Sequence, residues 1–328
     1  MEALTILKEL NSCFGPSGNE AEIANKIKAL VKPFADEIKT DVMGNLIVHV
    51  KGEGPKLMYA AHMDSIGFIV THIDSNGFLR VGVVGGIHPD TVIAEPVRFA
   101  NGTLGVLQED ADAKKHEVDK LLIDIGASSK ADAEKLVKLG DMAVFNTNAF
   151  VIGEDKVTSC YLDNRAGVCA QILAIERLKK AYYDTYFVFT VQEEVGLRGA
   201  KPAAFGIAPE YGIVVDTTIA DDIPKSNHIG TSVLGGGAAI KVMDKSVICH
   251  PEMVEKLQAL AKKKKIKAQL DVLRAGGTDG SEIRKSQNGV LTGGISVPTR
   301  YIHSPHEAAS LKDIEACANL IAAFAETK

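Results

Sequence analysis

The chain has 328 residues, 46% of them hydrophobic and 24% charged, which suits a globular protein with one large domain and a smaller one. Its net charge of -5 and its pI near 6.0 argue against a nucleic acid as the main partner. The sequence shows no signal peptide and no apolar stretch long enough for a membrane span, so we expect a cytoplasmic protein with no membrane partner.

The cysteine residues indicate the same compartment. They number five, and no two of them form a C-x-x-C pair. A chain of this length needs no disulfide bonds for stability, so we expect reduced and mostly buried thiols.

The N-terminal part of the chain predicts two helices followed by three strands. Apolar residues recur at helical spacing over 3–12 and over 20–34. A turn at 15–18 separates these helices, and Ser17 or Asn19 is expected to cap the second one. The strands are expected at 36–42, 45–51 and 56–61.

The pattern changes after Gly67. The segments that follow are short, alternate between apolar and polar residues and are punctuated by glycine, which is typical of a small β-rich module. Within this module the charged stretch 108–120 predicts a flexible loop. The expected elements are strands at 67–73, 77–84, 91–100, 103–107 and 121–125, a helix at 130–139 and a further strand before 145.

From about residue 158 onward, helices alternate with buried strands, which predicts an α/β layer sandwich. We therefore expect a catalytic α/β domain formed by 1–66 and 158–328, interrupted by a β-rich module at 67–157. The expected elements of the second part are a helix at 163–180, strands at 185–191 and 211–216, a helix at 251–264, a strand at 289–295 and a helix at 310–327.

Two adjacent carboxylates stand where a buried strand is expected to stop. Glu193 and Glu194 follow the apolar run 186–191. Because neighbouring side chains of an extended backbone point to opposite sides, one carboxylate could face a metal and the other a substrate water. Taken alone, such a pair is more often a solvated turn.

Three further candidate ligands precede this pair in the chain. His62 and Asp64 follow a predicted strand, and Asp64 could accept the second ring N–H of His62 and so fix the orientation of the imidazole. Asp163 precedes a predicted helix, where it is either a helix cap or a carboxylate whose two oxygens bridge two metals. Taken alone, each of these motifs more often has an ordinary structural role.

The last candidates are Asp216 and His303. Asp216 ends a predicted strand, where the alternative is a turn residue, and His303 has a neighbour, His306, that we expect to be an exposed bystander. Open α/β sheets bind ligands at the carboxyl ends of their strands, and several of these candidates fall there. A mixed oxygen and nitrogen donor set suits zinc, cobalt or manganese better than copper or an iron–sulfur cluster. Together the residues predict a two-metal hydrolase.

Several short motifs run across nearly the whole chain in a fixed order. They are Phe14-Gly15-Pro16-Ser17-Gly18-Asn19-Glu20, Ala61-His62-Met63-Asp64-Ser65-Ile66-Gly67, Leu162-Asp163-Asn164-Arg165, Gln192-Glu193-Glu194-Val195-Gly196, Val215-Asp216, Gly276-Gly277-Thr278-Asp279 and Arg300-Tyr301-Ile302-His303-Ser304-Pro305. In this order the chain resembles the dinuclear metal aminopeptidases of the glutamyl/leucyl aminopeptidase family, whose members assemble as hollow tetrahedral dodecamers.

The resemblance implies two divalent metal ions in each chain, zinc or cobalt in the first place and manganese as a third candidate. His62 and Asp216 would hold one ion. Glu194 and His303 would hold the other, and Asp163 would bridge the two.

The resemblance also implies a mechanism. A hydroxide shared by the two metals would attack the scissile peptide bond, and Glu193 would be the general base that serves it. Asp64 would orient His62. The substrates would be short peptides with a free N-terminal amine, and the loop 276–279 would line the pocket for their first side chain. The preferred first residue stays open.

The implied fold is a three-layer α/β/α sandwich of the zinc-exopeptidase type. The module at 67–157 would be an inserted dimerisation domain, either PDZ-like or a small barrel. The segment 81–87, which is apolar and rich in glycine, would supply surface for self-pairing. Dimers would then build a closed homo-oligomer, a dodecamer.

Two other enzyme classes remain as alternatives. A metal-dependent deacylase or dipeptidase on the same kind of sheet would use nearly the same ligands in the same order. A glycosidase would need two carboxyl groups about 5–9.5 Å apart on either side of a sugar bond. The adjacent, diverging pair Glu193 and Glu194 does not fit that demand, and the histidines would have no role.

Overall fold

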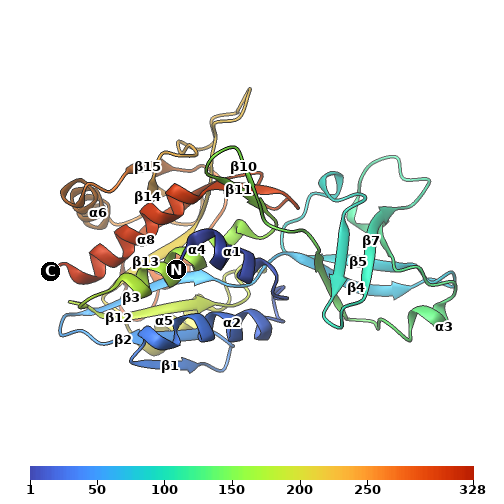
Figure 1. Ribbon diagram of the computed structural model, residues 1–328, viewed down its shortest axis with the longest axis horizontal. Helices are drawn as coiled ribbons and strands as arrows, with labels where there is room; N and C mark the ends of the chain where they lie inside the picture. The colour runs from blue at the N-terminus through green and yellow to red at the C-terminus, as the bar shows by residue number, and fades with distance from the viewer.

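In the computed structural model, which describes residues 1–328, a large α/β unit lies beside a smaller β-barrel (Figure 1). The large unit is built on an eleven-stranded sheet in the order β1-β2-β12-β3-β13-β16-β17-β11-β10, with β14 pairing with β16 and β15 with β14. Its strands are β1 (Glu37–Thr40), β2 (Leu46–Val50), β3 (Lys56–His62), β10 (Phe150–Ile152), β11 (Lys156–Ser159), β12 (Asp184–Thr190), β13 (Tyr211–Ile219), β14 (Ala238–Met243), β15 (Ala268–Val272), β16 (Leu291–Arg300) and β17 (Glu307–Ser310).

The middle of this sheet consists of parallel strands. β12 pairs in parallel with β3, β3 with β13, and β13 with β16. These strands are buried on both faces, which is why they read as continuous apolar runs in the sequence. Because they are parallel, their carboxyl ends lie at one edge of the sheet, and that edge faces the barrel (Figure 1).

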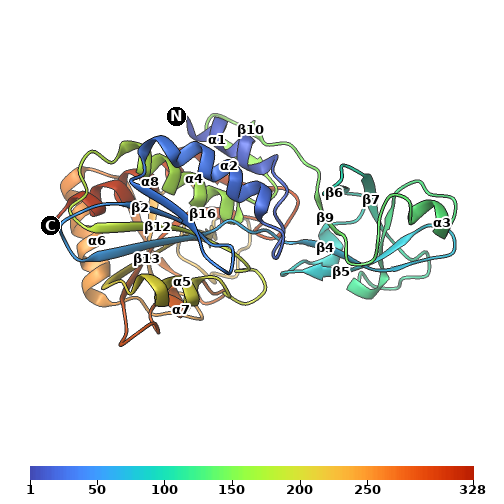
Figure 2. The same ribbon diagram turned by 90° about the horizontal axis from the view of Figure 1, so that it is seen from below.

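Helices cover both faces of the sheet and form two outer layers (Figure 2). The long α4 is buried nearly all round, because it lies between the sheet and the helices α1, α2 and α8. One face carries α1 (Ala3–Asn11), α2 (Ala21–Val31), α4 (Leu162–Arg177), α6 (Pro251–Lys264) and α8 (Leu311–Glu326), and the other carries α5 (Ala200–Ile207) and α7 (Gly280–Ile283). The expected three-layer α/β/α sandwich is confirmed.

The smaller unit is a closed barrel with the strand order β4-β5-β8-β7-β6-β9. Alternate side chains such as Phe68, Val70 and Val81 point into its core, which matches the alternation in the sequence. Its elements are β4 (Gly67–Ile73), β5 (Leu79–Val84), β6 (Pro96–Phe99), β7 (Leu104–Glu109), β8 (Leu121–Asp124), α3 (Lys130–Ala133) and β9 (Met142–Phe145). Of the two expected kinds of module, the structure has the small barrel.

The barrel is shorter in sequence than the module expected at 67–157. Its last strand ends at Phe145, and β10 already pairs with β11 in the large sheet. The strand β10 is short and its residues are exposed, so the local pattern does not show which sheet it joins. The helix expected at 130–139 has only one turn, α3, and irregular turns follow it. Val137 reaches the barrel core, whereas Leu136 and Leu139 stay exposed.

Three smaller expectations were wrong. The strand expected to stop at Asp216 continues to Ile219, because β16 pairs with it that far. Neither Ser17 nor Asn19 caps α2, which starts without a side-chain cap. The segment 81–87 is not a free apolar surface, since its large side chains are mostly buried in the barrel core.

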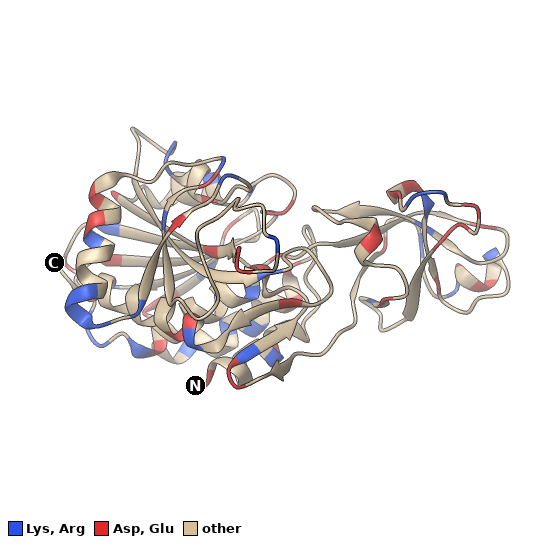
Figure 3. Ribbon diagram, turned by 90° about the horizontal axis from the view of Figure 1, so that it is seen from above, with Lys and Arg blue, Asp and Glu red and all other residues tan.

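The cysteines are reduced and buried, as the sequence predicted, and the charged residues are spread over the molecule (Figure 3). All five cysteines are free and buried. Acidic and basic residues are interspersed along the ribbon, with one basic stretch at 262–264 in the last turn of α6 (Figure 3). None of the helices has the length and hydropathy that a membrane crossing requires.

Candidate metal centre

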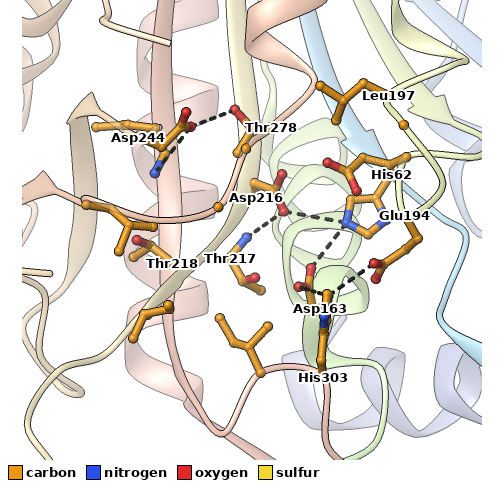
Figure 4. A pocket seen from close by; sticks show the side chains of 18 of the residues that line it. His62, Asp163, Glu194, Leu197, Asp216, Thr217, Thr218, Asp244, Thr278 and His303 are labelled. Carbon is orange, nitrogen blue, oxygen red and sulfur yellow. Dashed lines mark hydrogen bonds and ion pairs between the residues drawn. The ribbon is translucent and has the colours of Figure 1, made fainter. Parts of the chain in front are cut away.

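A cavity of about 490 Å³ lies at the carboxyl ends of the parallel strands (Figure 4). Several of the predicted site residues lie at or just after the ends of these strands. His62 is the last residue of β3, Glu193 and Glu194 follow β12, and His303 follows β16. Six of the seven predicted site residues line the cavity, and these are His62, Asp163, Glu193, Glu194, Asp216 and His303. The seventh, Asp64, lies behind the wall and is fully buried.

The two oxygens of Asp163 face two different groups of side chains (Figure 4). Asp163 Oδ1 lies 3.1 Å from His62 Nε2, and the same nitrogen lies 3.6 Å from Asp216 Oδ1. Asp163 Oδ2 lies 3.6 Å from His303 Nε2, which lies 3.1 Å from Glu194 Oε2. In each group one ligand atom from every residue lies within 4.8 Å of the others. We call these five residues the candidate metal centre.

The helix start explains why Asp163 is free to face the cavity. The backbone N–H of Gly167 donates to Asn164 Oδ1 at 3.1 Å, so Asn164 performs the capping role that the sequence left open for Asp163. The first regular turn of α4 therefore begins after Asn164, where the backbone dihedrals become helical.

The orientation of His62 is set by a backbone group. Its Nδ1 lies 3.1 Å from the backbone oxygen of Asp64 and 3.6 Å from the Oδ1 atom of the same residue. An N–H on Nδ1 that donates to this carbonyl leaves the lone pair of Nε2 facing the cavity, as metal binding requires. The carboxylate of Asp64 instead accepts the backbone N–H groups of Glu193 at 3.0 Å and of Glu194 at 3.3 Å.

A further buried carboxylate, Glu307, escaped the sequence analysis. Its two oxygens accept the backbone N–H groups of Asp163 and His303, both at 2.8 Å. The residue thus fixes the backbone of two members of the candidate metal centre at once. The only signal in the sequence is an acidic residue at the start of β17, which by itself is an ordinary strand residue.

Negative charge predominates among the side chains of the candidate metal centre. Burial lowers the pKa of His62, but the nearby carboxylates, Glu193 foremost, outweigh burial and raise this pKa well above its usual range. Burial likewise lowers the pKa of His303, and Glu194 with Asp163 raises it to about 9. Burial raises the pKa of Glu194. Divalent cations bound among these carboxylates would neutralise that charge.

The donor set fits divalent metal ions. It combines carboxylate oxygens with imidazole nitrogens, the ligands that zinc, cobalt and manganese accept. In addition, Glu194 Oε1 is buried and has no hydrogen-bond partner. A buried carboxylate oxygen without a partner is costly, and a cation bound there would remove that cost.

The opposite end of the cavity is bounded by a second polar group (Figure 4). Lys241 and Asp244 are buried there, and Asp244 Oδ2 accepts the hydroxyl of Thr278 at 3.1 Å. The Lys241 ammonium pairs with Asp271 at 2.8 Å. Neither Lys241 nor Asp244 was expected from the sequence. The loop 276–279 was expected to line the pocket for the first side chain, and Gly276, Gly277 and Thr278 do line the cavity.

The barrel contributes to the candidate metal centre through two glycines. A Cβ on Gly86 would lie 2.9 Å from His303 Nδ1, and a Cβ on Gly85 would lie 3.2 Å from Glu194 Cβ. Real Cβ atoms essentially never approach another atom closer than 3.0 Å. A side chain at Gly86 would therefore have to displace His303, and one at Gly85, where φ is 79° and a Cβ would lie 2.8 Å from Ile66 Cγ2, would be strained.

We expect Gly86→Ala to push the His303 ring away from Glu194 and so to weaken metal binding. The expected loss of affinity is about 10–100-fold, the range found when residues that orient metal ligands are replaced. Metal content after dialysis against graded chelator measures the effect. Gly82→Ala is the matched control, because its Cβ would meet only Thr71 and Ile69 at ordinary contact distances. Equal metal retention in both variants would contradict the expectation.

The chain is similar to known proteins over nearly its whole length. The model of the M42 glutamyl aminopeptidase family matches residues 44–320. The lysyl aminopeptidase of Pyrococcus furiosus is 37% identical over 98% of this chain and 96% of its own. The solved aminopeptidase APDkam598 of Desulfurococcus kamchatkensis is 41% identical, with a TM-score of 0.95 over 99% of this chain and 95% of its own.

A third similar protein is known as an assembly. The TET1 peptidase of Pyrococcus horikoshii is 35% identical, with a TM-score of 0.91 and full coverage of both chains. It is described as able to assemble into a tetrahedron or a large octahedral shell.

Proposed function

The chain belongs to the M42 glutamyl aminopeptidase family and is an aminopeptidase, and we propose that it removes the first residue of short peptides with the help of two divalent metal ions. The observation that carries the proposal of two ions is the placement of Asp163. One of its oxygens faces His62 and the other faces His303, so that a single carboxylate serves two groups of ligands.

The proposed ligands are the five residues of the candidate metal centre. His62 and Asp216 would hold one ion and Glu194 and His303 the other, and Asp163 would serve both. Zinc or cobalt is the proposed metal, with manganese as the third candidate. Bound at this site, two divalent ions supply a polarised peptide carbonyl and a water whose pKa is lowered toward about 7.

Glu193 is the proposed general base. It lines the cavity beside His62 without belonging to either ligand group. Its carboxylate takes the proton from the attacking water and passes it to the leaving amine. Burial raises the pKa of Glu193 well above its usual range, and the positive charge of His62 counteracts part of this rise.

The substrate side chain is placed at the other end of the cavity. We assign the first side chain of the peptide to the space bounded by Lys241, Asp244 and Thr278, with Ile219 and Leu273 as apolar walls. The free N-terminal amine then lies near the candidate metal centre, which explains exopeptidase action.

The experiment that tests this function is a hydrolysis panel. Metal-stripped protein is supplied with zinc, cobalt or manganese and assayed on aminoacyl-anilides that differ in the first residue. N-acetylated versions of the same anilides are the control. Hydrolysis of the free-amine series alone supports an aminopeptidase, whereas hydrolysis of the acetylated series or indifference to metal would overturn the proposal.

We also propose that dimers of this chain assemble into a closed homo-oligomer, a dodecamer, in the cytoplasm. The TET1 peptidase supports the assembly, and five free buried thiols fit a reducing compartment. The barrel carries exposed apolar side chains that suit self-contact, namely Leu104, Val106, Leu136 and Leu139. Enclosed active sites would admit short peptides and exclude folded proteins.

Light scattering at micromolar concentration with metal present should therefore report a mass many times 35.0 kDa. The expected value is twelve chains. A fully active protein that stays monomeric under these conditions would defeat the proposal of a closed assembly.

A further inference from the structure

The loop that carries Glu193 is held by two buried carboxylates that do not line the cavity. The backbone N–H of Gln192 donates to Glu20 Oε1 at 3.2 Å. The next two N–H groups, those of Glu193 and Glu194, donate to Asp64 Oδ1 and Oδ2 at 3.0 and 3.3 Å. Hydrogen bonds to an ionised acceptor are stronger than those between neutral groups. Three consecutive residues of the loop are thus fixed in place.

The loop needs this support because parts of its backbone are in an unfavourable conformation. Gln192 and Leu197 have φ values of 54° and 58°, in the left-handed region that residues other than glycine rarely adopt. Such conformations persist when the surrounding structure holds them. Without its carboxylate partners the loop would relax, and the Glu193 side chain would move with it.

The N-terminal segment 15–20 completes the support. Ser17 Oγ donates to Asp64 Oδ2 at 2.6 Å, and the backbone N–H of Ser17 donates to the oxygen of Ser65 at 3.1 Å. Glu20 Oε1 accepts a second bond, from the N–H of Gly18 at 2.7 Å. Ser17 and Glu20 are 4% and 8% exposed, and the cavity wall includes no residue before His62. Neither side chain can reach a substrate in the cavity.

We propose that Ser17 and Glu20 are positioning residues for Glu193. Ser17 acts through Asp64, and Glu20 acts through the backbone of Gln192. This inference rests on the proposed function, in which Glu193 moves the proton. Neither residue touches a metal-ligand side chain or the substrate. Asp64 also accepts the backbone N–H of Glu194, but the Glu194 side chain is held separately, 3.1 Å from His303 Nε2, so kcat should fall while KM and metal content at saturating metal stay near the wild-type values.

The test uses Ser17→Ala and Glu20→Ala in the metal-loaded protein. A shift of about 1 Å in a catalytic group can cost about 10²-fold in rate, so we expect kcat to fall by about 10–100-fold and KM to change by less than about 2-fold. Metal content per chain, measured on the same samples, should equal that of the wild type.

Two matched controls come from the same part of the chain. Ser12→Ala removes a hydroxyl that donates to the backbone oxygen of Glu9 at 2.8 Å. Glu22→Ala removes a carboxylate that accepts the N–H of Phe14 at 3.0 Å. Neither residue contacts the loop at 192–194, and both variants should keep wild-type kcat.

A double-mutant cycle tests the route through Asp64. If Ser17 acts through that carboxylate, Ser17→Ala should add nothing in an Asp64→Asn background, since contacts that share a partner are not additive. Additive losses, an unchanged kcat in both single variants, or a parallel loss of metal would overturn the inference. Full turnover by Glu193→Gln would overturn the proposed function itself. If Glu193→Gln were inactive while Ser17→Ala and Glu20→Ala were fully active, the inference would be overturned and the proposed function would stand.

Discussion

Replacing Glu193 with glutamine should lower turnover by about 10²–10⁴-fold while both metal ions stay bound. Glutamine has nearly the same shape and can still line the cavity, but it cannot accept the proton of the attacking water. The fold-change corresponds to about 3–5 kcal/mol of lost transition-state stabilisation. The measurement combines kcat on an aminoacyl-anilide with metal analysis of the same protein.

The control for this variant is Glu134→Gln, which changes an exposed glutamate of the barrel. Its Oε1 atom lies 3.9 Å from Lys130 Nζ. The control variant should behave as wild type in both assays. If Glu193→Gln lost its metal ions, Glu193 would be a ligand, and the roles assigned to Glu193 and Glu194 would have to be exchanged.

Without the carboxylate of Asp163, the protein should no longer hold two metal ions at the same time. Two dications about 4 Å apart repel each other with four times the energy of two unit charges, which is about 4 kcal/mol even in bulk water and more inside a protein. The carboxylate that faces both ligand groups offsets this repulsion. Asp163→Ala should therefore hold fewer than two ions per chain under conditions that saturate the wild type, and peptidase activity should fall with the ion count.

Calorimetric titration of the stripped protein with zinc measures both the affinity and the number of ions. Asp163→Asn provides a second variant with nearly unchanged shape, which guards against a folding defect. The control is Asp132→Ala, an aspartate of α3 whose partners, Ser129 and Lys135, lie on the barrel. If Asp163→Ala bound two ions at wild-type affinity, Asp163 would have no role in metal binding and would be an ordinary residue at the start of a helix.

Much of the secondary structure could be predicted because its signals are local. Apolar residues at helical spacing predicted α1, α2, α6 and α8 within a few residues, and alternation predicted the first barrel strands. The elements that escaped were short or mixed in character, such as α5, β10 and β17. Their residues take their structure from neighbours distant in sequence, since β17 pairs with β11 and β16.

The candidate ligands could be named from sequence because chemistry restricts them to a few residue types at strand and helix ends. Motif order then supplied a resemblance that the family match confirmed. The roles of the supporting residues had no such signal. Ser17 lies in one of the motifs, but neither it nor Glu307 belongs to a residue type that indicates a supporting role, and their partners, Asp64 and Asp163, lie 47 and 144 residues away along the chain.

The layer architecture, the family and the candidate ligands could be inferred from the sequence, because hydrophobic periodicity, residue chemistry and motif order are readable in short segments. The resemblance also implied how those ligands divide, but the geometry that brings them together came from the tertiary structure. In the folded chain, β12 lies between β2 and β3. The two oxygens of Asp163 face separate groups of ligands, and Gly85 and Gly86 of the barrel lie against the candidate metal centre. These relations depend on strand order and on the close approach of distant backbones. No local pattern encodes them, because their energy appears only when the segments meet.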